Sequence, residues 1–391
     1  MGNYSVLIGG RVLEGWKSFT ITNSINTPVA TAKIDYRDFT PSKFDEVNAV
    51  LEIRYKNIVL FKGYVFGTNK LEDPSTLTYS LEGRNFFADL VDSSIGYDPI
   101  FKGSSFIGML TSACRKYKAT TQFIVKTKNK EPISKVEREK ALPEENIWEY
   151  LSVLAKKRQI IPMVYPDNTL KLSDNVYLLG ERSGLAIIHD RMDNTAVTST
   201  TVNIDKQNLF HTYGFVSDVS SQKARAGKPV FKSGGVTDPT IRKTRVSYEN
   251  IRVEEDKSLA LRKIKWKKSV AEGSQKTLTT TTPSLLNNRN ALWRIGDYVD
   301  YTNDYIGVVG IYLITDVEYS FAVDRGTSCT LTLADPRAIL PEPPDAVTDK
   351  QNKRELQQKA RNKKRNKKKG IVEKTPYGNV SLAVLGDPNA K

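Results

Sequence analysis

Paired carboxylates are the first side chains of this sequence that could do chemistry. Asp89 and Asp92 lie close together after a run of strand-like residues, and Glu254 and Glu255 are adjacent. A glycosidase or peptidoglycan hydrolase needs two carboxyl groups on opposite sides of a cleft. Spacing along the chain does not place carboxyls across a cleft. These carboxylates are compatible with a hydrolase, but they do not indicate one, so a hydrolase stays an open alternative.

The other reactive side chains are few. The two histidines are His189 and His211, and the two cysteines are Cys114 and Cys329. Their spacing does not match a zinc site, neither histidine stands in a nucleophile–base pattern, and no P-loop or Gly-x-Gly-x-x-Gly element occurs. We therefore expect no catalytic, cofactor-binding or metal site, and we predict that the chain is not an enzyme.

Cysteine usage and hydropathy bear on the compartment. Two cysteines cannot form a disulfide framework. The N-terminal stretch MGNYSVLIGGRVLEG lacks the basic and apolar regions of a signal peptide. No apolar run approaches the roughly 18 residues of a membrane span. We expect a reduced chain that is synthesised in the cytoplasm and does not insert into a membrane.

The net charge of +15 is concentrated in one segment. Residues 349–374 hold twelve Lys or Arg and three Asp or Glu, so the body of the chain is only mildly basic. Residues 341–391 read as a Pro-rich linker and a basic tail. Three interpretations of the tail stay open: a solvated arm, a phosphate-binding arm, or a strap on a partner. Its partner-binding candidates are Lys363, Lys364, Arg365, Lys367, Lys368, Lys369 and the alternating Val380, Leu382 and Val384, which could add a strand to a partner's sheet.

Short alternating segments dominate residues 1–95. In one, Ala30, Ala32, Ile34 and Tyr36 share a face, with polar residues opposite. Such strands, separated by Gly, Asn and Pro, predict a small antiparallel barrel. Residues 96–175 change period and predict a small α/β domain with two helices. Ser104 or Ser105 caps the first helix, and Pro143 stands in the first turn of the second.

Strands return over residues 176–340 and predict a second barrel. An insertion around 213–257 is rich in Gly, Ser, Pro and Lys and reads as exposed. Residues 257–270 predict a helix with a basic outer face, which either is solvated or meets an acidic neighbour or DNA. The predicted fold class is therefore β-rich α+β, with two similar small antiparallel β-barrel domains separated by a small α/β domain, and a basic C-terminal extension.

Two segments of the chain follow one pattern. Each has an alternating strand, a polar turn, a glycine before a bulky strand (Gly63 and Gly310), and a Thr-rich strand that ends near an arginine (Arg84 and Arg337). Either any two hairpins look alike, or the barrel is duplicated. Head-to-tail contacts close subunits into rings. Three subunits with two similar modules each would form a ring of six similar modules.

The order of these parts resembles the central baseplate hub of contractile phage tails, in its Mu-like form. The corner motif of that family matches Gly83, Arg84, Asn85, Ala88, Asp89, Leu90, Val91 and Asp92. Its Leu-Trp-x-x-Gly-Asp-x-Val strand matches Leu292, Trp293, Gly296, Asp297 and Val299, and its closing strand matches Gly326, Thr327, Leu331 and Leu333. The match covers about residues 1–340. It departs from the family at Ser93 and at the bulky Phe86 and Phe87.

The resemblance implies structural work in the virion. A homotrimeric hub in the tail baseplate would adapt the six-fold tail tube to the three-fold central spike and surround the DNA exit channel. The implied partners are the spike protein, the tail tube or distal tube-initiator protein, the tape measure protein and baseplate wedge proteins, with DNA only in transit. The implied corner or interface residues are Gly83, Arg84, Asp89, Asp92, Trp293, Gly296 and Asp297.

Two other interpretations stay open. The charged corner residues could form a surface ion pair worth roughly 0–1 kcal/mol. The chain could also be an OB-like nucleic-acid-binding protein with a basic C-terminal arm. That alternative requires aromatic side chains exposed in a basic groove, whereas the alternation directs most barrel aromatics to the apolar face.

Overall fold

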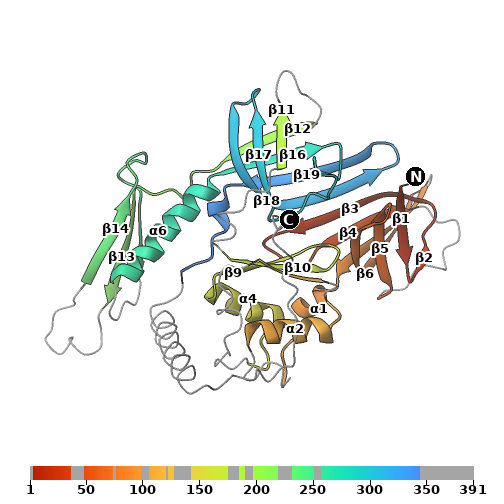
Figure 1. The fold of residues 1–391 in the computed structure, drawn as a ribbon, viewed down its shortest axis with the longest axis horizontal. Coiled ribbons are helices and arrows are strands. Elements are labelled where there is room, and N and C mark those ends of the chain that lie inside the picture. Colours follow the sequence, from red (N-terminus) through yellow and green to blue (C-terminus); the bar gives the residue numbers. More distant parts are fainter. Residues whose placement is uncertain are drawn as a thin grey trace, which may run out of the picture. The chain divides into compact units, whose positions relative to one another are not determined.

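The structure of the chain is a computed structural model (Figure 1). Residues Met1–Pro344 form one compact unit and Asp345–Lys391 a second. The structure describes residues 3–36, 48–73, 76–97, 105–119, 122–126, 142–174, 185–189, 197–218, 231–250 and 257–343. The second unit lies outside these ranges, so the fold described below is that of the first.

The N-terminal strands form the first β region. Their alternate residues are buried, as the period-2 pattern predicts; in β4, Ala32, Ile34 and Tyr36 face the core. The strands are β1 (Tyr4–Ile8), β2 (Arg11–Val12), β3 (Trp16–Ser24), β4 (Thr31–Tyr36), β5 (Val50–Tyr55), β6 (Ile58–Asp73) and β7 (Thr76–Asn85).

The second β region is built from later strands with the same alternation. In β19, the buried side chains of Cys329, Leu331 and Leu333 alternate along the strand with a serine and two threonines. The elements are β11 (Leu185–His189), β12 (Ser199–Ile204), β16 (Lys276–Thr282), β17 (Tyr298–Asn303), β18 (Val308–Ala322), β19 (Gly326–Ala334) and the 3-10 helix η3 (Pro336–Ile339).

The two β regions repeat one order of neighbouring strands. The first runs β3-β4-β7-β6-β5-β1, and the second runs β12-β16-β19-β18-β17-β11. Each has a β-bulge at the matching place, at Phe66 in β6 and at Thr315 in β18. One pairing differs, since β1 is antiparallel to β5 while β11 is parallel to β17.

A single pairing joins the two regions into one sheet of 13 strands. Strand β3 lies antiparallel beside the second half of β18, with Ile21 opposite Tyr319 (Figure 1). One hydrophobic core contains side chains from both regions. The β-rich α+β class is thus confirmed. The two separate barrels and the domain boundaries stay predictions.

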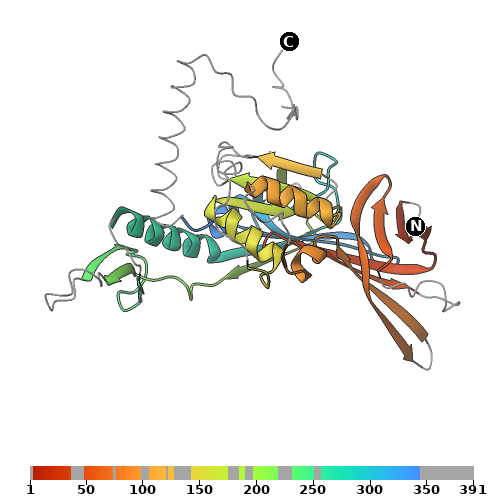
Figure 2. The same ribbon diagram turned by 90° about the horizontal axis from the view of Figure 1, so that it is seen from below.

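Three helices and a small sheet follow the first β region. Helices α2 and α4 lie side by side over the sheet β8-β10-β9 (Figure 2). Ser105 caps α2, as predicted, and Asn146 caps α4 by accepting a hydrogen bond from the N–H of Glu149. The prediction of Pro143 in the first turn of α4 is wrong, because the Asn146 cap starts the helix later. The elements are α1 (Ala88–Asp92), α2 (Phe106–Lys116), β8 (Gln122–Lys126), α4 (Ile147–Lys157), β9 (Ile160–Val164) and β10 (Thr169–Asp174).

The inserted segment of the second β region forms a layer of its own. Strands β14, β13 and β15 make a three-stranded sheet, and helix α6 packs on it through Ala260 and Ile264 against Tyr213 and Phe215 (Figure 1). The Gly- and Pro-rich composition gave no strand pattern for β14 and β15, because paired strands with exposed faces need few apolar residues. The elements are β13 (Thr212–Asp218), β14 (Phe231–Thr237), β15 (Val246–Asn250) and α6 (Lys257–Ser274).

Candidate assembly surface

One face of the 13-stranded sheet is polar on each strand from β12 to β7. Residues opposite each other in the strand register share a face, so the registers identify its members. We call this surface the polar face. Its positions are Ser199, Thr201, Asn203, Thr277, Thr279, Thr281, Ser328, Thr330, Thr332, Asp316, Glu318, Ser320, Ser18, Thr20, Thr22, Thr31, Lys33, Asp35, Ser80, Glu82 and Arg84.

Side chains of the polar face hydrogen-bond across the strands. These cross-strand pairs hold the short polar side chains against the sheet and leave a surface without protruding apolar groups. Two of these pairs lie within each β region, and none of the four crosses the β3–β18 junction. The donor–acceptor distances are 3.1 Å for Thr281–Thr330, 2.7 Å for Ser320–Ser328, 2.6 Å for Thr22–Thr31 and 2.9 Å for Ser18–Asp35.

The charge of the polar face is slightly acidic. A surface that binds nucleic acid gathers Lys and Arg against the phosphates and offers aromatic rings to the bases. The polar face does neither, since its 21 positions include no aromatic side chain and its acids outnumber its bases. The acidic positions are Asp35, Glu82, Asp316 and Glu318, and the basic ones are Lys33 and Arg84.

The corner after β7 brings two of the predicted site residues together. The Arg84 guanidinium donates two hydrogen bonds to the Asp92 carboxylate, at 2.6 and 3.2 Å, and stacks on the Phe66 ring. Gly83 lies where a Cβ would meet the Leu51 side chain at 2.5 Å. The corner therefore closes β7 against α1 by a bidentate ion pair, with half of the Asp92 side chain in solvent.

Asp89 lies on α1 beside this pair. Partial burial and the negative charge of Asp92 raise the pKa of the Asp89 carboxyl, while Arg84 acts in the opposite direction. Behind it, Phe87 and Leu90 are fully buried in the core of the helical layer. The bulky phenylalanines that depart from the family pattern thus anchor the corner on the helices.

The turn between β9 and β10 contacts both β regions. On the first side, Asn168 accepts a hydrogen bond from the Phe86 N–H at 3.0 Å and donates one to the Lys62 carbonyl at 2.8 Å. On the second side, Asp167 accepts a hydrogen bond from Arg294 at 3.1 Å. Asn168 is fully buried and has a positive φ of 65°. We call residues 166–168 the bridging turn. Nothing in the predicted set of site residues included them.

Trp293, Gly296 and Asp297 form the turn that leads into β17. The Trp293 carbonyl accepts a hydrogen bond from the buried Tyr319 hydroxyl, and the Gly296 N–H donates to the Ile314 carbonyl at 2.8 Å. Gly296 has a φ of 78°, and a Cβ there would overlap the Met163 sulfur. This turn therefore packs the second β region closely against β9.

The geometry can be compared with known proteins. No family model and no curated protein matches the sequence. Among solved structures, the chain is similar to the 43 kDa tail protein of prophage MuSo2 from Shewanella oneidensis, at 18% identity and a TM-score of 0.71 over 87% of this chain and 100% of that one. A tail protein from Neisseria meningitidis MC58 aligns at 19% identity and a TM-score of 0.67 over 86% and 98%. This chain has the fold of prophage tail proteins.

The resemblance inferred from the motifs is thus confirmed at the level of the fold. The tail-protein fold also extends to the Francisella PdpA–VgrG complex, in which the similar chain aligns at 8% identity and a TM-score of 0.55. That alignment covers 88% of this chain and 59% of that one. At these identities, the likeness concerns the path of the backbone.

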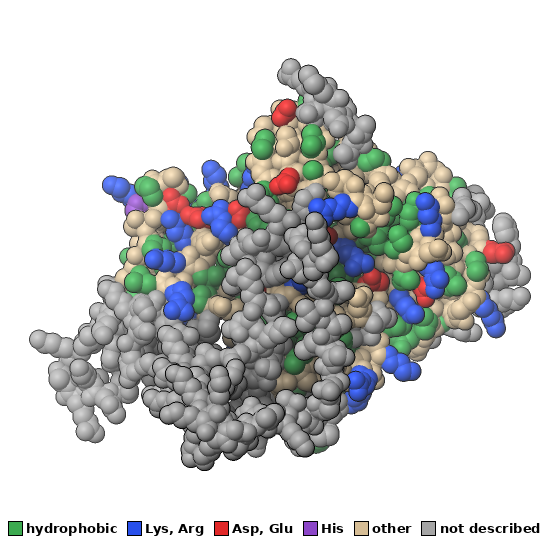
Figure 3. Space-filling view, in the orientation of Figure 1, with side chains coloured by type: hydrophobic (Ala, Val, Ile, Leu, Met, Phe, Trp, Pro, Cys, Tyr) green, Lys and Arg blue, Asp and Glu red, His purple; other side chains and the backbone are tan. Residues whose placement is uncertain are grey.

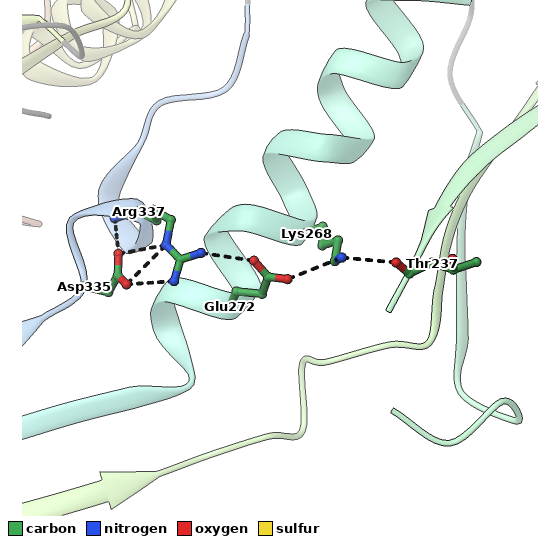
Figure 4. A network of polar contacts seen from close by, with 5 residues as sticks. All are labelled: Thr237, Lys268, Glu272, Asp335 and Arg337. Carbon is green, nitrogen blue, oxygen red and sulfur yellow. Dashed lines mark hydrogen bonds and ion pairs between the residues drawn. The ribbon is translucent and has the colours of Figure 1, made fainter. Parts of the chain in front are cut away.

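In this tail-protein fold, helix α6 is tied to the end of β19 by a polar network (Figure 4). Arg337 donates hydrogen bonds to Asp335 at 2.9 and 3.0 Å and to Glu272 of α6 at 3.2 Å. Lys268 reaches Glu272 at 3.5 Å and the Thr237 carbonyl at 3.1 Å. Although burial alone would raise it, the Arg337 hydrogen bonds hold the pKa of Asp335 below its usual value.

The basic side chains of α6 meet acids of the same chain. Lys263 pairs with Glu342 at 2.9 Å, and Lys267 pairs with Glu249 of β15. On the side of the molecule shown in Figure 3, Lys and Arg side chains are scattered over the described surface and do not merge into one basic patch. These two basic side chains of α6 are thus paired within the chain, while Arg262 and Lys265 are exposed, and the role of the basic face stays a prediction.

The reactive side chains considered from the sequence occupy structural positions. His189 stacks against the Tyr305 ring, and the His211 ring bonds the Thr212 hydroxyl. Burial raises the pKa of the Cys114 thiol to about 12 and also raises that of Cys329. The described residues contain no group of three or more His, Cys, Asp or Glu side chains able to hold a metal ion.

Several predicted features lie outside the described residues. They are Glu254 and Glu255, the tail lysines and arginine Lys363, Lys364, Arg365, Lys367, Lys368 and Lys369, and the alternating Val380, Leu382 and Val384. None of the described helices is long and apolar enough to cross a lipid bilayer.

Proposed function

We propose that this chain is a structural protein of a phage tail, and that three copies form the hub ring of its baseplate. The ring adapts a six-fold tail tube to a three-fold central spike and surrounds the channel through which DNA leaves. The chain performs no catalysis in this role. Assembly takes place after synthesis in the host cytoplasm, and the finished protein resides in the virion.

The repeated strand order carries this proposal. Two β regions of one chain share the order of six neighbouring strands and the position of a bulge. We infer that they are duplicated modules. A ring of three such chains presents six similar modules to one partner and three chains to another, because closed rings use head-to-tail contacts.

The polar face supports its assignment as the channel wall. Hydroxyl side chains hydrate well and acidic side chains repel phosphate, so a duplex passes them without long-lived contacts. This is the opposite of the OB-like nucleic-acid-binding alternative, which needs exposed aromatic residues and a basic groove. No feature of the described surface favours that alternative.

The proposed partners follow from the ring. They are two further copies of this chain, a central spike, the tail tube or its distal initiator, the tape measure protein and the baseplate wedges. The fold shared with a chain of the Francisella PdpA–VgrG complex supports association with a spike component. The basic tail is proposed to lie on an acidic tail protein.

Native mass spectrometry of the full chain tests the proposal. The expected result is a species of three times the 43.9 kDa chain, alone or with co-expressed tail proteins. A strict monomer in both contexts overturns it. Truncation after residue 348 then separates the alternatives: if the body alone binds duplex DNA tightly with steep salt dependence, the nucleic-acid-binding interpretation replaces the hub.

A further inference from the structure

Two of the open strand edges in the described 13-stranded sheet belong to β6 and β12. Strand β6 pairs with β5 over residues 58–64 and with β7 over residues 63–73, so its second half has a neighbour on the β7 side alone. Strand β12 pairs with β16 on one side, and no described strand lies on the other. Open edges of this kind are templates for pairing with another chain.

The edges equivalent to those of β6 and β12 are the edges of β18 and β3, and these two strands pair with each other. Strand β18 pairs with β17 over residues 308–313 and then with β3 over residues 316–322. In the repeated order, β18 corresponds to β6 and β3 corresponds to β12. The β3–β18 pairing therefore is an observed example, within one chain, of the contact that β12 and β6 lack.

The bulges and registers align the two copies residue by residue. Matching Phe66 to Thr315 sets Asn69 of β6 at the position of Glu318 in β18. The strand partners of β6 lead through β7 and β4 to β3, and those of β18 lead through β19 and β16 to β12. Comparing the two paths sets Asn203 of β12 at the position of Thr22 in β3. Thr22 lies opposite Glu318 in the structure.

We propose that β12 of one subunit pairs antiparallel with the second half of β6 of the next subunit, with Asn203 opposite Asn69. The occupant is a second copy of this chain, and the inference rests on the proposed function, whose ring it specifies. The two edges do not pair within the described chain. They lie at opposite ends of the order β12-β16-β19-β18-β3-β4-β7-β6, about 33 Å apart along the sheet at ~4.8 Å per strand.

Exposed apolar side chains occur at both open edges. Ile204 of β12 is 59% exposed, and Phe66 at the β6 bulge is also 59% exposed. Their counterparts at the filled junction, Asn23 and Thr315, are 5% and 7% exposed. In the proposed register Ile204 lies opposite Thr68, within diagonal reach of Phe66. Pairing therefore covers apolar surface that the isolated chain leaves in water.

Engineered disulfides test the register in the full-length protein. Cysteines at directly opposed strand positions are close enough to bridge. The double variant Asn69→Cys with Asn203→Cys is expected to give covalent dimers and trimers on a non-reducing gel after mild oxidation, with no larger species. Thr22→Cys with Glu318→Cys is the matched control, and it is expected to give a cross-linked monomer.

A shifted pair and the native mass keep the two proposals separable. Glu82→Cys with Asn203→Cys moves one cysteine a strand further away, and this pair is expected to give no ladder. If the Asn69/Asn203 variant is trimeric by native mass, and the Thr22/Glu318 control bridges, but no ladder forms, the β12–β6 pairing is overturned while the hub stands. If the variant and the unmodified chain are both monomeric, alone and with tail proteins, the hub itself is overturned.

Discussion

The two β regions share a sheet but end in different attachments. In the first, β7 runs into the Arg84–Asp92 pair and then into the helical layer. In the second, β19 runs into η3, where Arg337 holds Asp335 and Glu272 together and fastens α6. Each region thus follows its last strand with a short helical turn and an arginine that binds carboxylate. What differs is the element that the arginine fastens.

This difference indicates which parts of the fold are interchangeable. Strand order, bulge position and the polar face recur in both regions, and in the proposed ring they would serve the contact that both regions make. The helical layer and α6 occur once each, and in the proposed ring they would serve contacts that a chain makes once. The predictions below break or sharpen this division.

The largest effect is expected at Gly63, which the sequence pattern equates with Gly310, although the bulges set Gly63 at the position of Tyr312. A Cβ at Gly63 would overlap the backbone carbonyl of Arg84, whereas a Cβ at Gly310 meets only the Tyr312 ring at 3.2 Å. Gly63→Ala is expected to lower the free energy of unfolding by about 3 kcal/mol or more, because a paired strand cannot move aside. Gly310→Ala is expected to cost under about 1 kcal/mol. Urea denaturation measures both, and equal losses would contradict the close approach of β6 to the corner.

The next effect is expected at the bridging turn. Asn168→Ala removes two side-chain hydrogen bonds from a buried site and places alanine at a positive φ. We expect a loss of about 2–4 kcal/mol in unfolding free energy. Asn48→Ala is the control, since Asn48 also has a positive φ but is exposed; it is expected to cost about 1 kcal/mol. If the two variants lose the same stability, the bridging hydrogen bonds contribute nothing.

The two arginines give a smaller and unequal pair of effects. Arg337→Ala breaks bonds to two carboxylates and is expected to cost about 1–2 kcal/mol. Arg84→Ala breaks one pair whose acid is half exposed, and is expected to cost under about 1 kcal/mol. Thermal unfolding of both variants at low and high salt measures the difference. A larger loss for Arg84→Ala would reverse the ranking of the two attachments.

The smallest effects are expected in the pH dependence that Asp335 and Asp89 give to the stability of the protein. The pKa of Asp335 is lowered in the folded state, so its contribution is present above the unfolded value of about 3.9 and is lost as the pH falls through the folded value. The pKa of Asp89 is raised, so the folded state binds its proton more tightly and stability falls as the pH rises through the folded value.

Asparagine substitutions at these positions should therefore act with opposite signs. Asp335→Asn is expected to destabilise the protein at pH 7 and to lose that effect in acid, whereas Asp89→Asn is expected to raise stability at pH 7. Urea midpoints at pH 7 and pH 3 measure both changes. Destabilisation by Asp89→Asn at pH 7 would show that its ionised form is favoured at the corner.

Local pattern predicted most of the strands and the chemistry of the corner. Alternation identifies β4 and β19 because one face of each packs against the core. The corner motif placed Arg84 near Asp92 because β7 and α1 are adjacent in sequence. Sequence pattern could not predict the pairing of strands that are distant in sequence, since nothing in residues 16–24 indicates that β18 is their neighbour. Pairing between remote strands is decided by the fold of the whole sheet.

The bridging turn was missed for a related reason. Pro-Asp-Asn is an ordinary turn signal, and it does not reveal that Asn168 bonds the backbone at Phe86 and Lys62, more than eighty residues earlier. The one available hint was an Asn at a turn position that tolerates a positive φ. In the insertion, the Gly and Ser content gave no strand pattern for β14 and β15, whose described side chains are half-buried or exposed.

The β3–β18 junction has a mechanical consequence for the proposed ring. Three of the six seams are crossed by the polypeptide itself and are braced from the side by the bridging turn, through Asn168 and Arg294. The other three depend on strand pairing alone. Tension around the circumference of the proposed ring would then concentrate on every second seam, so an overloaded ring should part into three intact arcs and not into six pieces.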